Sequence, residues 1–302
     1  MSEIALLGVD WGSTSVRAFA IAPDGTIVDT NRADDGVFAR AGNFASRLRH
    51  LLGDWQTRWP GAPVLLCGMI GSDRGWVHAP YVAAPAAAED LAAALVPVPF
   101  DVPARIVPGI SHVDGDTREV MRGEETLLMG LGVDAPRVRV CLPGTHTKWV
   151  DLVDGRIVSF RTHMTGELRA LVLGQGALAA AAPQIASAQA FHAGLVASQA
   201  DPSLARSLFQ ARARRLLGTL EAAHTASFVS GILIGRELAG ERETAAHNVP
   251  IILAARGSLA DEYGAALRHS NFTFAQIDPE PRAAQGLLRL ARRAKPPRIG
   301  SM

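Results

Sequence analysis

Residues that could perform chemistry first occur on a predicted turn near the amino terminus, in the string Gly8–Ser15 (GVDWGSTS). The apolar run Ile4–Val9 predicts a buried strand that leads into this turn. Asp10, at the end of that strand, offers carboxylate oxygens to a Mg²⁺ ion, directly or through water. Gly12 lets backbone N–H groups approach an anion. Three hydroxyl donors follow, on Ser13, Thr14 and Ser15. The turn is thus a candidate phosphate site, and an ordinary strand-to-strand turn is the alternative interpretation.

A second turn of the same kind follows the apolar run Val138–Leu142, in the string Pro143–Trp149 (PGTHTKW). Its candidate phosphate ligands are Gly144, Thr145, His146, Thr147 and Lys148. Each turn is followed by a strand, an Asp-Gly hairpin and another strand, with the hairpins at Asp24-Gly25 and Asp154-Gly155. We infer a weak internal duplication that presents two phosphate-type turns on two similar half-molecules.

Two residues of the second turn have more than one interpretation. His146 either contacts a phosphate or makes a structural hydrogen bond. Lys148 would neutralise phosphate charge if its side chain faces the ligand. Because side chains alternate along a strand, either Lys148 or its neighbour Trp149 points away.

A glycine-rich loop, Gly68–Tyr81 (GMIGSDRGWVHAPY), follows the predicted buried strand Val64–Cys67. Open α/β sheets bind ligands at this place, beyond the carboxyl end of a strand. The candidate substrate-binding residues of the loop are Gly71, Ser72, Arg74 and Trp76. Arg74 would bind a carboxylate and Trp76 would stack on a carbon skeleton. The alternatives are a solvated arginine and a tryptophan that anchors the core.

Two adjacent acids, Glu124 and Glu125, begin a helix predicted within Met121–Val133 (MRGEETLLMGLGV). Acids in a first helical turn interact favourably with the helix dipole, which is a purely structural explanation. Their position shortly before the second hydroxyl turn keeps a role in chemistry open.

The elements that must position these residues follow from the apolar periodicity. Apolar residues at helical spacing predict one amphipathic helix over 44–59, and the stretch 164–245 is mostly helical. Further predicted elements are strands at Val249–Ala254 and Asn271–Ile277 and helices at Ser258–Leu267 and Pro281–Ala294, the last with a solvated basic face. At 302 residues the chain is twice the usual domain size of roughly 150, and prolines predict a junction near 105–115.

Composition excludes several kinds of partner. The formal net charge of +1, from 30 basic and 29 acidic side chains, provides no field that attracts nucleic acid or an anionic membrane. Cys67 and Cys141 lie far apart in apolar runs, so neither a disulfide framework nor a C-x-x-C site is indicated. The nine histidines lack the spacing of zinc ligands. Neither a signal peptide nor a membrane span is predicted, so we expect a cytoplasmic protein.

Five strings of the chain together resemble one enzyme family: GMIGSDRGW, MRGEET, PGTHTKW, HMTGEL and SGILIGREL. From Asp10 to about Leu290 the chain resembles the 2-dehydro-3-deoxygalactonokinase family, and its repeated plan looks like the actin-like ATPase fold of acetate and sugar kinases. The resemblance implies an α/β fold in which two duplicated ribonuclease H-like domains flank an ATP cleft. The expected domains are residues 1–110, on the sugar-acid side, and residues 111–302, with a helical insertion, on the ATP side.

The resemblance also implies a reaction, the ATP-dependent phosphorylation of the 6-hydroxyl of 2-dehydro-3-deoxy-D-galactonate in galactonate breakdown, with Mg²⁺ at Asp10. In related carbohydrate kinases a G-D-Q string before the second phosphate turn carries the general base, and Gly123–Glu125 occupies the corresponding place. Glu124 is therefore the implied base, with Glu125 as the second choice. The implied partners are ATP and a sugar acid, and a homodimer is compatible with the sequence.

Other functions stay open at this level. A kinase of another 2-keto-3-deoxy sugar acid, such as the gluconate epimer, would differ in a few hydrogen bonds at one stereocentre. A superfamily phosphatase acting on polyphosphate or nucleotides would use water as the nucleophile. A sugar-responsive regulator usually carries a helix-turn-helix segment, for which we expect no room before a first strand at residue 4. A dehydrogenase is disfavoured, because no G-x-G-x-x-G follows a strand.

Overall fold

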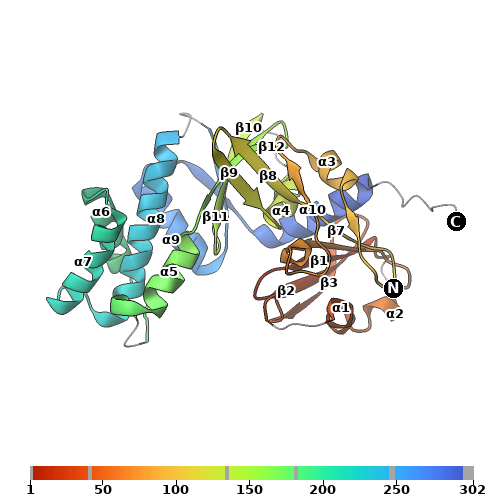
Figure 1. The fold of residues 1–302 in the computed structure, drawn as a ribbon, viewed down its shortest axis with the longest axis horizontal. Helices are drawn as coiled ribbons and strands as arrows, with labels where there is room; N and C mark the ends of the chain where they lie inside the picture. The colour runs from red at the N-terminus through yellow and green to blue at the C-terminus, as the bar shows by residue number, and fades with distance from the viewer. Residues whose placement is uncertain (1–2, 40–42, 133–135, 180–182, 245–248, 295–302) are drawn as a thin grey trace. The chain divides into compact units, whose positions relative to one another are not determined.

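The computed structural model describes residues 3–39, 43–132, 136–179, 183–244 and 249–294 (Figure 1). The chain divides into two compact units. Unit 1 contains Met1–Pro136, Asp151–Phe160 and Pro279–Met302, and unit 2 contains Arg137–Val150 and Arg161–Asp278. Unit 1 therefore extends past the boundary expected at 110/111 and includes the last helix of the chain.

A six-stranded sheet forms the centre of unit 1, in the order β3-β2-β1-β4-β7-β6. Its strands are β1 (Leu6–Trp11), β2 (Val16–Ile21), β3 (Ile27–Ala33), β4 (Val64–Gly68), β6 (Val96–Pro97) and β7 (Ala104–Ile106). Strand β1 pairs antiparallel with β2 and parallel with β4. The hairpin predicted at Asp24-Gly25 is confirmed, because β2 and β3 pair antiparallel on either side of it.

The parallel pairing of β1 with β4 brings two strand ends to the same edge of the sheet. Asp10 lies opposite Cys67, and Trp11 lies opposite Gly68. Ligands of open α/β sheets bind outside the carboxyl ends of the strands. The first predicted turn and the glycine-rich loop therefore start from neighbouring positions on the edge where a ligand is expected.

The helices of unit 1 are α1 (Phe44–Leu52), α2 (Trp55–Arg58), η1 (Met69–Gly71), α3 (Ala88–Ala93), α4 (Glu124–Met129) and α10 (Pro279–Arg293). The single helix predicted over 44–59 is interrupted, since Gly53 adopts φ +56° and its N–H caps α1 by binding the Arg49 carbonyl. Leu48, Leu52 and Trp55 are nevertheless buried as the periodicity predicts. A small three-stranded sheet contains β5 (Tyr81–Ala83), β8 (Gly109–Asp114) and β9 (Thr117–Met121).

Helix α10 packs against α4 and against β1 (Figure 1). Two glycines permit the close helix contact: a Cβ on Gly286 would lie 1.8 Å from the Thr126 carbonyl oxygen, and one on Gly130 would lie 1.9 Å from that of Arg282. Leu287 is fully buried. The predicted basic helix is thus confirmed as a helix, but its apolar face belongs to the core of unit 1.

Unit 2 is built on a five-stranded sheet in the order β12-β11-β10-β13-β14. Its strands are β10 (Arg137–Leu142), β11 (Thr147–Val153), β12 (Arg156–His163), β13 (Ile251–Ala254) and β14 (Phe274–Ile277). Residues 151–160, at the ends of β11 and β12, belong to unit 1. The order repeats that of β3-β2-β1-β4-β7 in unit 1. The topology therefore contains the internal duplication that the two turns predict.

The helices of unit 2 are α5 (Thr165–Gly174), η2 (Gly176–Leu178), α6 (Ala188–Ala200), α7 (Leu204–Leu216), η3 (Ala222–His224), α8 (Thr225–Thr244) and α9 (Gly257–His269). They confirm the helical stretch predicted over 164–245 for the residues described. Helices α6 and α8 pack closely through glycine, since a Cβ on Gly194 would lie 2.1 Å from the Phe228 carbonyl oxygen. Within the described ranges, no helix combines the length and the apolar character that crossing a bilayer requires.

Candidate functional site

The first turn is fixed through its carbonyl groups. The carbonyls of Gly12, Ser13 and Thr14 accept hydrogen bonds from the N–H groups of Val37, Phe38 and Gly36, at 2.9 to 3.1 Å. The side chains of Thr14 and Ser15 remain exposed, and Ser13 is partly exposed. The turn therefore has a defined backbone and accessible hydroxyl donors, as a phosphate site requires.

Asp10 lies beside this turn with its carboxylate paired. The Arg17 guanidinium donates from Nη2 to Asp10 Oδ2 at 2.6 Å, and the Asp10 side chain is 21% exposed. Arg17 Nη1 also lies 3.6 Å from Glu280 of α10. Within the described ranges, no group of three or more His, Cys, Asp or Glu side chains is arranged to hold a metal ion. A metal ion at Asp10 would therefore take water or phosphate oxygens as its other ligands.

Two glycines bring the start of α4 to the same sheet edge as Asp10. A Cβ on Gly123 would lie 3.2 Å from the Gly68 Cα, and one on Gly68 would lie 3.4 Å from Asp10 Oδ1. Both glycines adopt positive φ, +108° at Gly123 and +90° at Gly68, which strongly favours glycine. Unit 1 thus gathers the predicted metal ligand and the two predicted acids, although the sequence separates them by more than a hundred residues.

The two adjacent acids have different environments. Glu125 is fully buried, and its carboxyl accepts hydrogen bonds from the Gly123 N–H at 2.6 Å and from the Thr126 hydroxyl at 3.1 Å. Burial, and then the charge of Glu124, raise the pKa of Glu125 to about 8. Glu124 is partly exposed, and its Oε2 accepts the Arg122 N–H at 3.0 Å. Both acids lie in the first turn of α4, so the structural explanation of their position also applies.

The glycine-rich loop folds tightly on itself after β4. The Ile70 carbonyl accepts the Trp76 N–H at 2.8 Å, and the Gly71 carbonyl accepts the Ala79 N–H at 2.9 Å. Trp76 is partly buried against the core of unit 1 and meets Phe100 edge to face at 6.1 Å. Trp76 therefore packs on the core, which was one of its two predicted roles.

Polar side chains of this loop differ in their surroundings. Arg74 is exposed, and its guanidinium carbon lies 4.1 Å from the centroid of the Phe38 ring. The Ser72 hydroxyl oxygen is buried and has no hydrogen-bond partner among the residues described. An unpaired buried hydroxyl is uncommon in a folded protein and points to a ligand or water partner.

Arg122, a residue that the sequence patterns do not mark, also reaches this loop. Its Nη2 donates to the Ala79 carbonyl at 2.6 Å, and its guanidinium carbon lies 4.5 Å from the Tyr81 ring centroid. A Cβ on Gly71 would lie 2.9 Å from Arg122 Nη1. Its Nε and Nη1 are buried and have no partner within the described structure. Leaving a buried donor unpaired costs about 1 to 3 kcal/mol, and more for a charged group. The position of this arginine directly before Gly123-Glu124 was the available signal.

The residues of the second turn, in unit 2, differ in their burial. Thr145 and His146 are exposed and Gly144 is partly exposed, whereas Thr147 and Lys148 are buried. His146 Nε2 lies 2.5 Å from Glu167 Oε2. The backbone is held by α5, since the Glu167 N–H donates to the Thr145 carbonyl at 2.9 Å. The exposed part of the turn is thus Gly144 to His146.

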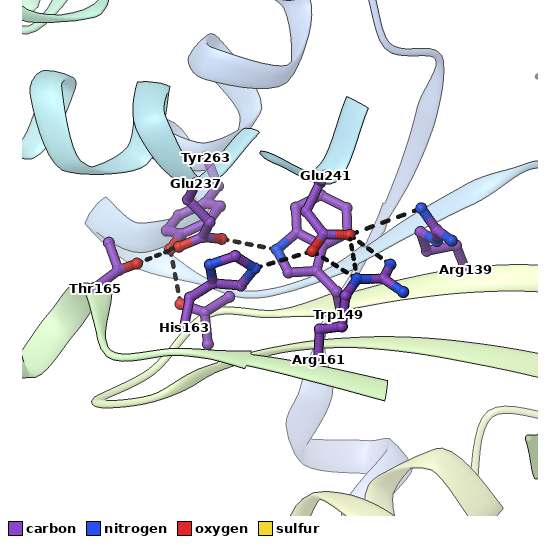
Figure 2. Close-up of polar contacts among 9 residues, drawn as sticks. Arg139, Trp149, Arg161, His163, Thr165, Glu237, Glu241 and Tyr263 are labelled. Atoms are coloured by element: carbon purple, nitrogen blue, oxygen red, sulfur yellow. Dashed lines mark hydrogen bonds and ion pairs between the residues drawn. The ribbon is translucent and has the colours of Figure 1, made fainter. Parts of the chain in front are cut away.

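Below the second turn lies a buried polar cluster centred on α8 (Figure 2). Glu237 accepts hydrogen bonds from Trp149 Nε1 at 2.8 Å, from the Tyr263 hydroxyl at 2.9 Å and from the Thr165 hydroxyl. Tyr263 in turn pairs with the Thr147 hydroxyl at 2.8 Å. Burial raises the pKa of Glu237 above its ordinary value. The cluster therefore supports Thr147 and Trp149 from beneath.

One helical turn further along α8, Glu241 forms ion pairs with basic side chains (Figure 2). It pairs with Arg161 at 2.6 Å and His163 at 2.9 Å, and Arg139 Nη1 lies 3.7 Å away. Burial opposes ionisation of Glu241, but hydrogen bonds from His163 and Arg161 lower its pKa overall. Burial alone would lower the pKa of His163, yet the Glu241 carboxylate raises it. These contacts join α8 to β10 and β12 within unit 2.

Comparison with distantly related solved structures supports the fold. The chain is similar to component A of (R)-2-hydroxyglutaryl-CoA dehydratase from Acidaminococcus fermentans, with a TM-score of 0.52 and 12% identity over 97% of this chain and 100% of that one. It is also similar to the activator of the 2-hydroxyisocaproyl-CoA dehydratase from Clostridium difficile with bound ADPNP, with a TM-score of 0.50 and 13% identity over 95% and 93%. This likeness confirms the expected α/β fold.

The family follows from closer relatives. The model of the 2-keto-3-deoxy-galactonokinase family matches residues 10–290, so the chain belongs to that family. It is 39% identical to the 2-dehydro-3-deoxygalactonokinase of Escherichia coli K12 over 259 residues, which cover 85% of this chain and 87% of that protein. A crystal structure of a candidate 2-dehydro-3-deoxygalactonokinase from Sinorhizobium meliloti has a TM-score of 0.86 and 34% identity, over 95% of this chain and 98% of that one. The predicted family is thereby confirmed.

Proposed function

We propose that this protein transfers the γ-phosphoryl group of ATP to the 6-hydroxyl of 2-dehydro-3-deoxy-D-galactonate, a step of galactonate breakdown. The observation that carries the proposal is the meeting of Asp10, Gly68 and Gly123 at one edge of the unit 1 sheet. Asp10 directly precedes the phosphate-type turn, and Gly123 directly precedes Glu124, a partly exposed carboxylate, which supports a common site for the two acids. Membership of the 2-keto-3-deoxy-galactonokinase family supports the choice of acceptor.

Each of the two turns would offer ligands to the phosphates of ATP. In unit 1 the ligands are Gly12 and the hydroxyl residues Ser13, Thr14 and Ser15. In unit 2 they are Gly144, Thr145 and His146, with Thr147 and Lys148 acting from buried positions. Asp10 would hold Mg²⁺ after its carboxylate exchanges Arg17 for the ion. Bound there, Mg²⁺ would neutralise charge on the phosphates.

Glu124 is the proposed general base. The sugar hydroxyl loses its proton to the Glu124 carboxylate, a bond forms between that oxygen and the γ-phosphorus, and the bond from the γ-phosphorus to the β,γ-bridging oxygen breaks. Glu125 is less suited, because a carboxyl with a pKa of about 8 is mostly protonated at pH 7. The sugar acid would bind at the loop that carries Gly71, Ser72, Arg74 and Trp76.

The experiment is a coupled assay of ADP release with a panel of 2-keto-3-deoxy sugar acids, followed by identification of the phosphorylated position. We expect the galactonate derivative to have the highest kcat/KM. A higher kcat/KM with the gluconate epimer would show a kinase with a different substrate. Phosphate release from polyphosphate or nucleotides without an acceptor would instead show a phosphatase.

The Glu124→Gln variant should lose about 10²- to 10⁴-fold in kcat and still bind ATP. Turnover within tenfold of the wild type would remove Glu124 as the base.

A further inference from the structure

Two donors of Arg122 are not used by the part of unit 1 that the structure describes. Nε and Nη1 are buried and have no hydrogen-bond partner there, whereas Nη2 donates to the Ala79 carbonyl. Arg47, a structural arginine of the same unit, shows the contrast. Its guanidinium donates to the Asp35 carboxylate and to the carbonyls of Asp35 and Gly36. A charged group that keeps unpaired N–H bonds in a shielded place is suited to receive an anion.

The surroundings of Arg122 specify where that anion would lie. The guanidinium rests on the Tyr81 ring at 4.5 Å and approaches Gly71 so closely that a Cβ there would be 2.9 Å from Nη1. The next residue of the loop, Ser72, has a second buried donor without a partner in the described structure. The Arg122 backbone N–H is bound to Glu124 Oε2 at 3.0 Å. The unpaired donors therefore belong to the segment that directly precedes the proposed base.

We propose that Arg122 binds the carboxylate of the sugar-acid substrate through its unpaired N–H groups, with the Ser72 hydroxyl as an additional donor. The proposal rests on the proposed function, because it takes its anion from that substrate. Arg74, the other cation of the loop, is exposed on the Phe38 ring, and an exposed charge attracts an anion less strongly than a shielded one.

The test compares two acceptors, 2-dehydro-3-deoxy-D-galactonate and its carboxamide, which lacks the negative charge. Kinetics with each acceptor and with ATP are measured for the wild type and for Arg122→Met, Arg122→Lys and Arg74→Met. Arg58→Met is the matched control, because Arg58 also stacks on an aromatic ring, that of Trp59 at 4.4 Å, and lies in α2 rather than in the loop.

We expect Arg122→Met to raise the KM for the acid roughly 30- to 100-fold, as the loss of charge-assisted hydrogen bonds implies, and the KM for ATP less than about threefold. The wild-type preference for the acid over its carboxamide should disappear in this variant and be reduced in Arg122→Lys. Arg58→Met should behave like the wild type. If Arg122 were only structural, Arg122→Met would lower kcat/KM equally for the acid and for its carboxamide, and the preference for the acid would stay intact.

Two results overturn the inference: a preserved preference for the acid in Arg122→Met, or a preference lost in Arg74→Met instead. If the thermal midpoint shows that Arg122→Met does not fold, Arg122→Lys replaces it. A preference for the acid over its carboxamide that is unchanged in Arg122→Lys would then overturn the inference. Calorimetric titration of the acid without nucleotide separates the two proposals. A wild type that neither binds nor phosphorylates the acid ends the proposed function and this inference with it. A wild type that does both, with Arg122→Met binding equally well, ends only the inference.

Discussion

At the scale of single residues, the two adjacent glutamates at the start of α4 show how the fold places identical carboxyl groups in different environments. Glu125 is fully buried, whereas Glu124 is partly exposed. Burial raises the pKa of Glu125 to about 8, so folding favours its protonated form. The ionised form is disfavoured in the native state, and the stability of the protein must therefore depend on pH.

Glu125→Gln should remove this dependence. The folded pKa of Glu125 is above its unfolded value, so the unfolded state binds fewer protons, and stability falls as pH rises from about 4.5 towards about 8. Because glutamine does not ionise, the thermal midpoint of the variant should rise relative to that of the wild type as pH increases across this window. Scans between pH 5 and pH 9 measure the difference. Asp116→Asn, at an exposed turn, is the control, and its thermal midpoint should change with pH as that of the wild type does. A difference in thermal midpoint between Glu125→Gln and the wild type that stays constant across this pH range would contradict the argument.

Single residues also show which parts of the site the sequence could predict. The positions of Asp10 near the end of β1 and of Glu124 at the start of α4 were predictable, because local patterns set these two elements; their roles in the chemistry stay predictions. The unpaired donors of Arg122 and the pairing of Thr147 with Tyr263 were not. Both depend on side chains that meet only after the chain has folded, and hydrophobic periodicity carries no information on such contacts.

At the scale of elements, α8 joins the parts of unit 2 through acids on one face. Glu237 and Glu241 are four residues apart, so both project towards the strands β11 and β12 (Figure 2). Glu241 is 2% exposed and is the counter-charge of Arg161 and His163. Removing it would take a buried counter-charge away from Arg161 and His163, whose side chains are partly buried, and from Arg139, whose side chain is 4% exposed.

Glu241→Ala should therefore lower the free energy of unfolding by about 3 kcal/mol or more. The ion pair between Arg206 and Asp201 supplies the control, because the Arg206 side chain is 78% exposed, and Arg206→Ala should cost less than about 1 kcal/mol. Urea titrations at neutral pH give both values. Equal, small losses for the two variants would mean that the cluster around Glu241 adds little to the stability of unit 2.

Most elements were predictable from the sequence, because local signals set them. Asp-Gly turns fix the hairpins, and apolar runs fix β1, β4 and β10. Two features were missed for a physical reason. The break between α1 and α2 depends on the positive φ of Gly53, and the place of the amphipathic helix α10 in unit 1 depends on a partner, α4, that is distant in sequence.

At the scale of the whole molecule, the two units repeat one strand order and each presents a Gly/hydroxyl turn after its first strand. The repetition does not make them equivalent. Unit 1 carries the loop with the unpaired donors and the accessible Glu124, and unit 2 carries a turn supported by the buried cluster on α8. In the proposed function, unit 1 therefore recognises the sugar acid, and each unit offers one turn to phosphate.

Hydrogen exchange can test this division of labour, since ligands slow exchange where they suppress local opening. The sugar acid alone should protect residues 68–80 and 121–125 of unit 1 and leave residues 143–148 of unit 2 unchanged. A non-hydrolysable ATP analogue with Mg²⁺ should protect residues 143–148 together with residues 10–15. Saturating inorganic phosphate is the control for a simple anion effect. If the sugar acid alone protected 143–148 as strongly as 68–80, acid recognition would not reside in unit 1, and the duplicated units would share both ligands instead of dividing them.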